Sequence, residues 1–244
     1  MRILITNDDG IKAEGLKILV EKAQKYGEVF VVAPLHEQSA KSHSICVRKG
    51  IKIEESNYFP GIKTYIVDST PADCVRYAAY GLKEEFDVVF SGVNHGFNLG
   101  DDIMYSGTVA GASEGALVGK KAIAFSSHWQ GYEGALEYFD EVMEYINTFK
   151  LLDKADILNV NFPRIVEGIA LTQQGYTHYD SHFVHENGEY FQKGTPHFEL
   201  EKENIDSDVS AAYNNKISIT PLTINRTDLL AYKAIIQSFN DKKQ

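Results

Sequence analysis

The chain has 244 residues and 43% hydrophobic content, which is enough for one large α/β domain with a substantial core. Its 24 basic and 34 acidic residues give a net charge of −10, which argues against a long nucleic acid as ligand. No apolar stretch reaches the roughly 18 residues of a membrane span, and the first residues lack the pattern of a signal peptide. With only Cys46 and Cys74, the composition is typical of a cytoplasmic protein with reduced thiols.

The first two-thirds of the chain alternate between strand and helix patterns. Strands are predicted at residues 2–6, 28–33, 48–54, 62–67, 87–91, 121–127 and 157–161. Helices are predicted from Leu16 to near Gly27, after Thr70, from Val109, and at about 133–149. This alternation predicts an α/β fold with a Rossmann-like, doubly wound, mostly parallel sheet. Ligands of such sheets bind beyond the carboxyl ends of the strands.

The pattern changes after residue 172. Residues 173–206 are aromatic and polar with weak alternation, which predicts a β-hairpin excursion that serves as an oligomerisation or lid element. A short helix near 207–214 and a strand at 217–220 return to the core, so the catalytic core is predicted to comprise residues 1–172 together with 207–222. The remaining segment, 223–244, contains a helix from about 227 to 240.

Two adjacent carboxylates, Asp8 and Asp9, follow the first predicted strand and precede Gly10. Neighbouring carboxylates repel each other unless a cation lies beside them, and glycine permits close approach of the backbone. The pair therefore indicates a site for a hard divalent cation. A solvated turn is the alternative, because Asp, Asn and Gly are ordinary turn residues.

The loop after the second predicted strand contains Ser39, which by itself would be interpreted as a turn or cap residue. Lys41 and His43 follow in the same loop. Either side chain could face an anion, although exposure to solvent is the more ordinary interpretation.

A glycine-rich segment, residues 91–115, contains the strongest indication of phosphate binding. Ser106, Gly107 and Thr108 enter a helix of small residues, where backbone N–H groups, hydroxyls and the helix dipole favour an anion. A capped, tightly packed helix is the alternative. The segment is not a Walker loop, because no Gly-Lys-Ser/Thr ends it, and it follows too late a strand for a dinucleotide fingerprint.

Several other groups are weaker candidates. His178, His182 and His185 resemble a metal cluster, but a strand would not place all three on one face. Tyr105 and Trp129 could stack on a base or simply pack. Asp101 and Asp102 could bind metal or be solvated beside a helix.

Together, these segments match one family in order and over most of the chain. The segments NDDG, VAPLHEQSAKSHSI, TPADCV, SGVNHGFNLGDDIMYSGTVAGASEG, LNVNFP and SDVSAAYNNKISITPL resemble the SurE survival-protein family of nucleotidases. The resemblance implies a metal-dependent 5'- and 3'-nucleotidase that releases phosphate from nucleoside monophosphates, in some members also from polyphosphate. It also implies a homodimer or homotetramer, with the C-terminal helix used for oligomerisation.

The resemblance assigns roles to individual residues. Asp8, Asp9, Ser39 and Asn94 are the implied metal ligands, with Asp8 and Asp9 the implied catalytic residues. Asn98, Ser106, Gly107 and Thr108 are the implied phosphate contacts. All four ligands offer oxygen, which favours one Mg²⁺ or Mn²⁺ per subunit, with Ca²⁺ also compatible, over Zn²⁺.

The chain departs from the family pattern at four positions, Ala40, Ser69, Ser207 and Asn214. None of these removes an implied ligand, although Ala40 replaces a glycine that usually follows the ligand serine. The nucleophile stays open between water, Asp8 and Ser39. A receiver-like signalling domain or a nucleotide-binding sensor without turnover is the alternative function, and the chain is about twice as long as a receiver needs.

Overall fold

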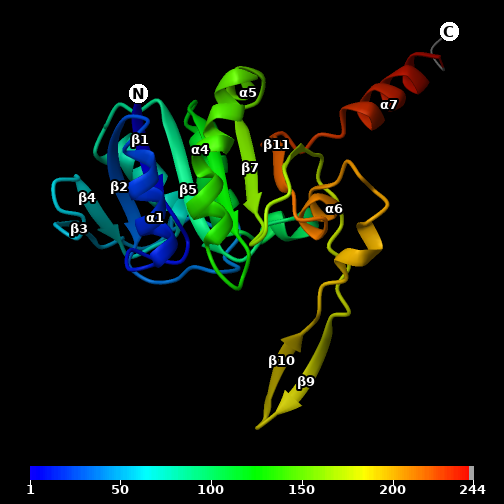
Figure 1. Ribbon diagram of the computed structural model, residues 1–244, viewed down its shortest axis with the longest axis horizontal. Coiled ribbons are helices and arrows are strands. Elements are labelled where there is room, and N and C mark those ends of the chain that lie inside the picture. Colours follow the sequence, from blue (N-terminus) through cyan, green and yellow to red (C-terminus); the bar gives the residue numbers. More distant parts are fainter. Residues whose placement is uncertain (242–244) are drawn as a thin grey trace.

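A nine-stranded sheet forms the centre of the computed structural model, which describes residues 1–241 (Figure 1). Its strands lie in the order β3 (Ile53–Ser56), β4 (Thr64–Val67), β2 (Glu28–Pro34), β1 (Arg2–Thr6), β5 (Val88–His95), β6 (Lys121–Ser127), β7 (Ile157–Phe162), β11 (Ile217–Leu222) and β8 (Ile169–Leu171). The six strands from β4 to β7 in this order are parallel, whereas β3 and β11 run antiparallel to their neighbours β4 and β7. This confirms the predicted Rossmann-like, doubly wound, mostly parallel sheet.

Helices cover both faces of this sheet (Figure 1). On one face, α1 (Glu14–Ala23) and α4 (Glu133–Thr148) bury apolar side chains such as Leu19 and Phe139 in the larger core cluster. On the other, α2 (Pro71–Arg76) and α3 (Gly107–Leu117) pack against each other and contribute Val75 and Ala112 to a second cluster. The chain order reverses between β1 and β5, which makes their carboxyl ends the switch point where ligands bind in such folds.

The expected elements differ from the observed ones mainly where tertiary contacts extend or shift them. Strand β5 continues to His95 instead of ending at 91, because Asn94 and His95 pair with β6 after a register shift. The first strand of the extended pair covers 53–56 rather than 48–54. A short helix, α5 (Leu151–Lys154), and strand β8 have no counterpart among the expected elements.

The segment after the core forms projections, as Figure 1 shows. Strands β9 (His182–Glu186) and β10 (Glu189–Lys193) make a two-stranded antiparallel hairpin that extends away from the sheet. Helix α6 (Asp208–Tyr213) returns to the body, and α7 (Leu229–Asp241) leaves it again. Residues 242–244, the end of the predicted C-terminal segment, lie outside the described part. Across residues 1–241, no helix is both long and apolar enough to span a membrane.

Candidate functional site

The predicted ligands lie at the carboxyl edge of three adjacent strands. Asp8 and Asp9 follow β1, the Ser39 loop follows β2, and Asn94 lies near the end of β5. Because β1 pairs in parallel with both β2 and β5, these strand ends meet at one edge of the sheet. Two hydrogen bonds from backbone N–H groups join the segments: the Gln38 N–H donates to the Asp8 carbonyl over 2.7 Å, and the His95 N–H donates to the side-chain Oδ2 of Asp9 over 3.2 Å.

Asp8 is the most buried of the predicted ligands, with 4% of its surface exposed. Its Oδ1 accepts a hydrogen bond from the Thr108 hydroxyl. Burial raises the pKa of Asp8 to about 6, against the opposing effect of the Thr108 hydrogen bond and with a further rise from the Asp9 charge. The site therefore holds a carboxylate whose charge is poorly solvated.

Gly107 allows this arrangement at the first residue of α3. A Cβ atom there would lie 2.7 Å from Asp8 Cβ and 2.8 Å from Asp8 Oδ2, closer than real Cβ contacts. Only a residue without a side chain lets the N-terminus of α3 approach Asp8 so closely. The positive end of the helix dipole consequently lies at the carboxylate.

Asp9 and Asn94 are oriented by backbone groups. Burial raises the pKa of Asp9, and the backbone N–H of His95 opposes that rise. The Asn94 side-chain amide nitrogen donates to the Gly96 carbonyl over 2.8 Å. With the nitrogen engaged, the amide oxygen is the atom of Asn94 that remains for a ligand.

Ser39 lies in an exposed loop, where its Oγ donates to Glu37 Oε1 over 2.7 Å. The following residue, Ala40, has a φ of 56°, in the left-handed region that favours glycine. The glycine that the resemblance leads us to expect at this position would match the backbone that the loop adopts, and alanine adopts it at an energetic cost.

The predicted phosphate contacts divide into two groups. Ser106 caps α3, with its Oγ accepting from the Val109 N–H over 3.0 Å, and Thr108 is bonded to Asp8 as described above. Gly107 and these two residues place a helix N-terminus, the expected anion-binding element, beside the two carboxylates.

Asn98 belongs to a buried network at the ends of β6 and β7. Its side-chain nitrogen donates to Ser126 Oγ over 2.8 Å, and its backbone N–H donates to Asn161 Oδ1 over 2.8 Å. Its carbonyl accepts from the side chains of Asn159 and Asn161. The network fixes the position of the chain between Asn94 and α3, and Asn98 is itself 6% exposed.

Sequence reasoning assigned no role to Asn161 or Asp208. Asp208 is fully buried and accepts from the backbone N–H groups of Gly100, over 3.0 Å, and Gly175, over 2.8 Å. Both residues hold the Asn98–Gly100 segment in place. Their segments, LNVNFP and SDVSAAY, were part of the resemblance, but nothing in one sequence shows which backbone groups their side chains reach.

The weaker candidates do not join the site. His178 bonds to Glu201 Oε1 over 3.0 Å, His182 to the Asp180 carbonyl over 3.0 Å, and His185 packs on Tyr190. Among the side chains that the structure describes, no three of His, Cys, Asp or Glu gather as a possible metal site. Asp102 accepts a hydrogen bond from the Tyr179 hydroxyl. Tyr105 and Trp129 are both exposed, at 63% and 62%.

The donors around Asp8 suit a hard divalent cation. Asp8 and Asp9 form no ion pair with any Lys, Arg or His side chain in the described part of the chain. Burial beside a second carboxylate disfavours the ionised form, and a positive charge at the pair would stabilise it. Two carboxylates completed by neutral hydroxyl and amide oxygens form the kind of donor set that Mg²⁺ and Mn²⁺ accept.

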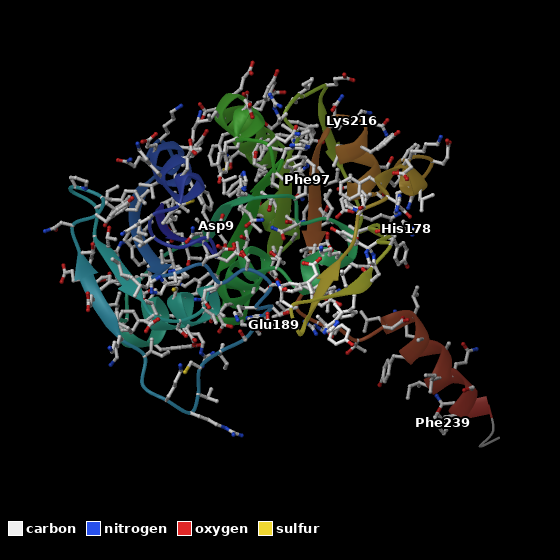
Figure 2. The ribbon with its side chains drawn as sticks, turned by 90° about the horizontal axis from the view of Figure 1, so that it is seen from below. Asp9, Phe97, His178, Glu189, Lys216 and Phe239 are labelled. Atoms are coloured by element: carbon white, nitrogen blue, oxygen red, sulfur yellow. The ribbon has the colours of Figure 1, made fainter. Side chains whose placement is uncertain are left out.

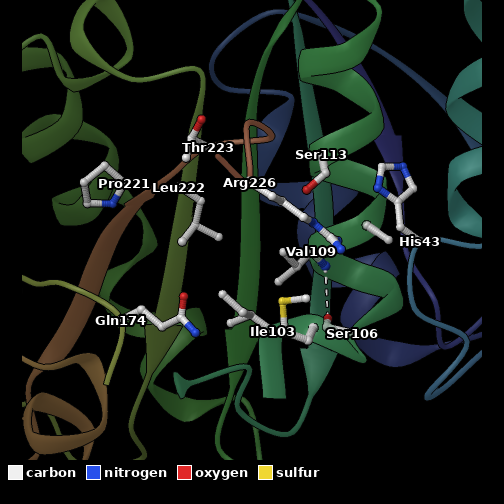
Figure 3. A pocket seen from close by; sticks show the side chains of 12 residues that line it. His43, Ile103, Ser106, Val109, Ser113, Gln174, Pro221, Leu222, Thr223 and Arg226 are labelled. Carbon is white, nitrogen blue, oxygen red and sulfur yellow. Dashed lines mark hydrogen bonds between the residues drawn. The ribbon is translucent and has the colours of Figure 1, made fainter. Parts of the chain in front are cut away.

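A cavity of about 470 Å³ begins at Ser106 and follows the outer face of α3 (Figure 3). Its apolar wall includes Val109 and Leu222, and Figure 3 shows Arg226 extending across it towards α3. His43, from the Ser39 loop, lines the opposite side. The cavity thus connects the start of α3 with the chain that leaves β11.

Comparisons with known proteins agree on one family. The family model described as survival protein SurE matches residues 3–181. The chain is 38% identical to a 5'-nucleotidase SurE of Alkaliphilus metalliredigens, covering 96% of this chain and 97% of the relative, and 37% identical to that of Syntrophomonas wolfei, covering 98% and 95%. The crystal structure of the SurE protein from Aquifex aeolicus superposes with a TM-score of 0.79 at 31% identity, covering 96% of this chain and 98% of that one.

Proposed function

This chain belongs to the SurE family, and we propose that it is a metal-dependent phosphomonoesterase that hydrolyses nucleoside 5'- and 3'-monophosphates, and also polyphosphate. The name 5'-nucleotidase, which both curated relatives carry, supports the nucleotide substrate. One observation of this chain carries the proposal: the buried carboxylate of Asp8, beside the half-buried carboxylate of Asp9, lies against the N-terminus of α3, and neither has an ion-pair partner in the described part of the chain. Such a site accommodates a cation and a phosphate together.

We assign the cation to Asp8, Asp9, Ser39 and Asn94. When bound, a divalent cation supplies Lewis-acid polarisation of the phosphate and lowers the pKa of a water molecule. The two carboxylates and the Asn94 amide oxygen are oriented for this role by Thr108, the His95 N–H and the Gly96 carbonyl.

The phosphate is assigned to the start of α3. The helix dipole and the N–H groups at its first turn would stabilise the charge that develops on the phosphoryl oxygens. Asp8 is a poor candidate for direct attack on phosphorus, because it is buried and accepts the Thr108 hydrogen bond. We therefore favour water as the nucleophile.

The test is phosphate release from AMP by metal-stripped protein, before and after addition of Mn²⁺ or Mg²⁺, with Asp9→Asn alongside. We expect release only with metal and only in the unsubstituted protein. Full turnover by Asp9→Asn would contradict the assignment of Asp9. Tight nucleotide binding without release under any of the metals would indicate a sensor instead. Adenosine 3'-monophosphate and polyphosphate, assayed in parallel, test the wider substrate range.

We also propose that α7 joins copies of this chain into a homodimer or homotetramer. Its apolar side chains are exposed, among them Leu230 at 82% and Phe239 at 61%, and the helix extends away from the body (Figure 2). Exposed apolar faces of this kind mark association surfaces. Light scattering should give a mass above the 27.3 kDa of one chain, and Leu230→Asp with Phe239→Asp should lower it. A monomeric mass for the unsubstituted chain would contradict this proposal.

Cytoplasmic localisation remains a prediction. Cys46 and Cys74 are both free thiols in the structure, and burial raises the pKa of the Cys74 thiol well above its usual range. A thiol of that kind is inert.

A further inference from the structure

A buried carboxylate lies in α3 about two turns beyond Ser106. Glu114 is 2% exposed, and each of its oxygens has a partner: His43 Nε2 at 2.7 Å from Oε2, and Arg76 Nη1 at 2.9 Å from Oε1. Burial by itself would raise the pKa of Glu114, but the hydrogen bonds from His43 and Arg76 outweigh it and lower the pKa. A carboxylate so buried is stable only with such partners.

His43 brings this carboxylate into contact with the Ser39 loop. Three bonds hold residues 38–43 against the rest of the molecule: the Gln38 N–H donates to the Asp8 carbonyl, the Ser42 N–H donates to the Tyr105 carbonyl over 3.0 Å, and the His43 ring bonds to Glu114. Of these, the His43 bond is the one made by a side chain. Ser39 itself bonds within the loop, to Glu37.

The backbone of this loop is in an unfavourable conformation. Ala40 has a φ of 56° and Ser42 a φ of 52°, so two residues with side chains adopt the left-handed region within three positions. Such conformations persist only where the surrounding structure holds them, and they gather at functional sites. A loop that is strained in this way and exposed to solvent would relax if the His43–Glu114 bond were removed.

We propose that Glu114, acting through His43, positions the Ser39 loop so that the Ser39 hydroxyl is ready for the cation. His43 and Glu114 are then positioning residues, which touch neither cation nor substrate. The inference rests on the metal site of the proposed function. The Ser39 hydroxyl is a weak, neutral metal ligand, and holding it in place before the cation arrives lowers the entropic cost of binding. The His43–Glu114 bond should therefore contribute more to metal affinity than to the stability of the fold.

The test compares Mn²⁺ affinity, by calorimetry on metal-stripped protein, with the melting temperature measured without metal. His43→Ala should weaken Mn²⁺ binding about tenfold, the lower end of the range for residues that orient metal ligands. Its turnover should recover at saturating Mn²⁺. Unchanged Mn²⁺ affinity in a folded His43→Ala protein would overturn the proposal, as would a fall in melting temperature with no change in affinity.

Three further variants make the experiment specific. His43→Gln keeps an N–H donor of similar reach and should retain the affinity of the unsubstituted protein. Arg76→Met removes the other partner of Glu114 but leaves the loop anchored, so its affinity should also be retained; a loss equal to that of His43→Ala would overturn the proposal. Adding Ala40→Gly to His43→Ala relieves the backbone and should recover part of the lost affinity.

The same measurements separate this inference from the proposed function. If the unsubstituted protein binds Mn²⁺ and releases phosphate while His43→Ala binds Mn²⁺ equally well, the positioning role alone is wrong. If the unsubstituted protein does not bind Mn²⁺, the metal site itself is wrong, and the positioning role falls with it.

Discussion

The hydroxyl of Thr108 donates a hydrogen bond to Oδ1 of Asp8, a residue one hundred positions earlier in the chain. The bond connects the first turn of α3 to the end of β1, across the switch point of the sheet. It also opposes the effect of burial on the pKa of Asp8. Thr108, which the resemblance associates with phosphate, thus acts through its side chain on Asp8, a predicted metal ligand.

Replacing Thr108 by valine keeps the shape of the side chain but removes the hydroxyl, and should therefore lower the affinity of the site for metal. Without the hydrogen bond, the pKa of Asp8 rises further, and a protonated carboxyl is a poor ligand. We expect Mn²⁺ affinity near neutral pH to fall about 10–100-fold, as for other groups that orient metal ligands. Thr108→Ser keeps the hydroxyl and should remain close to the unsubstituted protein. Equal affinity in the valine and serine variants would show that the bond has no such role.

Substitution of Gly107 by alanine should disrupt the site by steric contact. The new Cβ would lie within 3 Å of Asp8 Cβ and Oδ2, so either Asp8 or the start of α3 must move. Since a displacement of about 1 Å can cost about 100-fold in rate, AMP hydrolysis should fall by at least that factor. Gly50→Ala is the matched control, because a Cβ there meets nothing within 4 Å. If both variants kept full turnover, the close approach of α3 to Asp8 would be unnecessary for catalysis.

Metal binding should depend on pH through Asp8. Its pKa is raised to about 6, so below that pH the carboxyl is protonated and Mn²⁺ must displace a proton. Calorimetry should show affinity falling by up to tenfold per pH unit below about 6 and levelling off above it. Affinity that stays constant from pH 5 to 7.5 would contradict the raised pKa.

The metal-free protein should show the opposite trend. A carboxyl with a raised pKa contributes stability below its unfolded value, near 3.8, and loses that contribution as pH rises through about 6. The full effect is at most about 3 kcal/mol in the free energy of unfolding. Denaturant unfolding of metal-free protein across this range measures it. Asp8→Asn is the control, since it removes the titration.

Ala40→Gly should stabilise the metal-free protein slightly. Glycine adopts a φ of 56° without the left-handed penalty of about 1–2 kcal/mol, although its larger unfolded-state entropy offsets about 0.5–1 kcal/mol of that. A net gain of about 0.5–1 kcal/mol corresponds to a rise of about 1–4 °C in melting temperature. Calorimetry of both proteins without metal checks this, and a lower melting temperature for the glycine variant would mean that the loop is not strained at Ala40.

The sequence alone determined most of the local elements and the oxygen chemistry of the predicted ligands. Strand β1 was predicted at its observed bounds, because a short apolar run ended by Asp, Asp and Gly has one ordinary interpretation. The carboxylates, the capped start of α3 and the family were equally recoverable, since each depends on neighbouring residues or on segments in a fixed order.

Tertiary structure alone decided the contacts between distant segments. Four contacts are of this kind: the Thr108–Asp8 bond, the close approach of Gly107 to Asp8, the bond of His43 to Glu114, and the bond of Gly100 to Asp208. Each joins residues that are 71 to 108 positions apart in the sequence. The length of β5 also depended on pairing with β6. Periodicity and turn residues report on a few neighbouring positions, whereas these contacts exist only in the folded chain, where the parallel sheet brings the ends of β1, β2 and β5 to one edge and α6 packs beside the segment after β5.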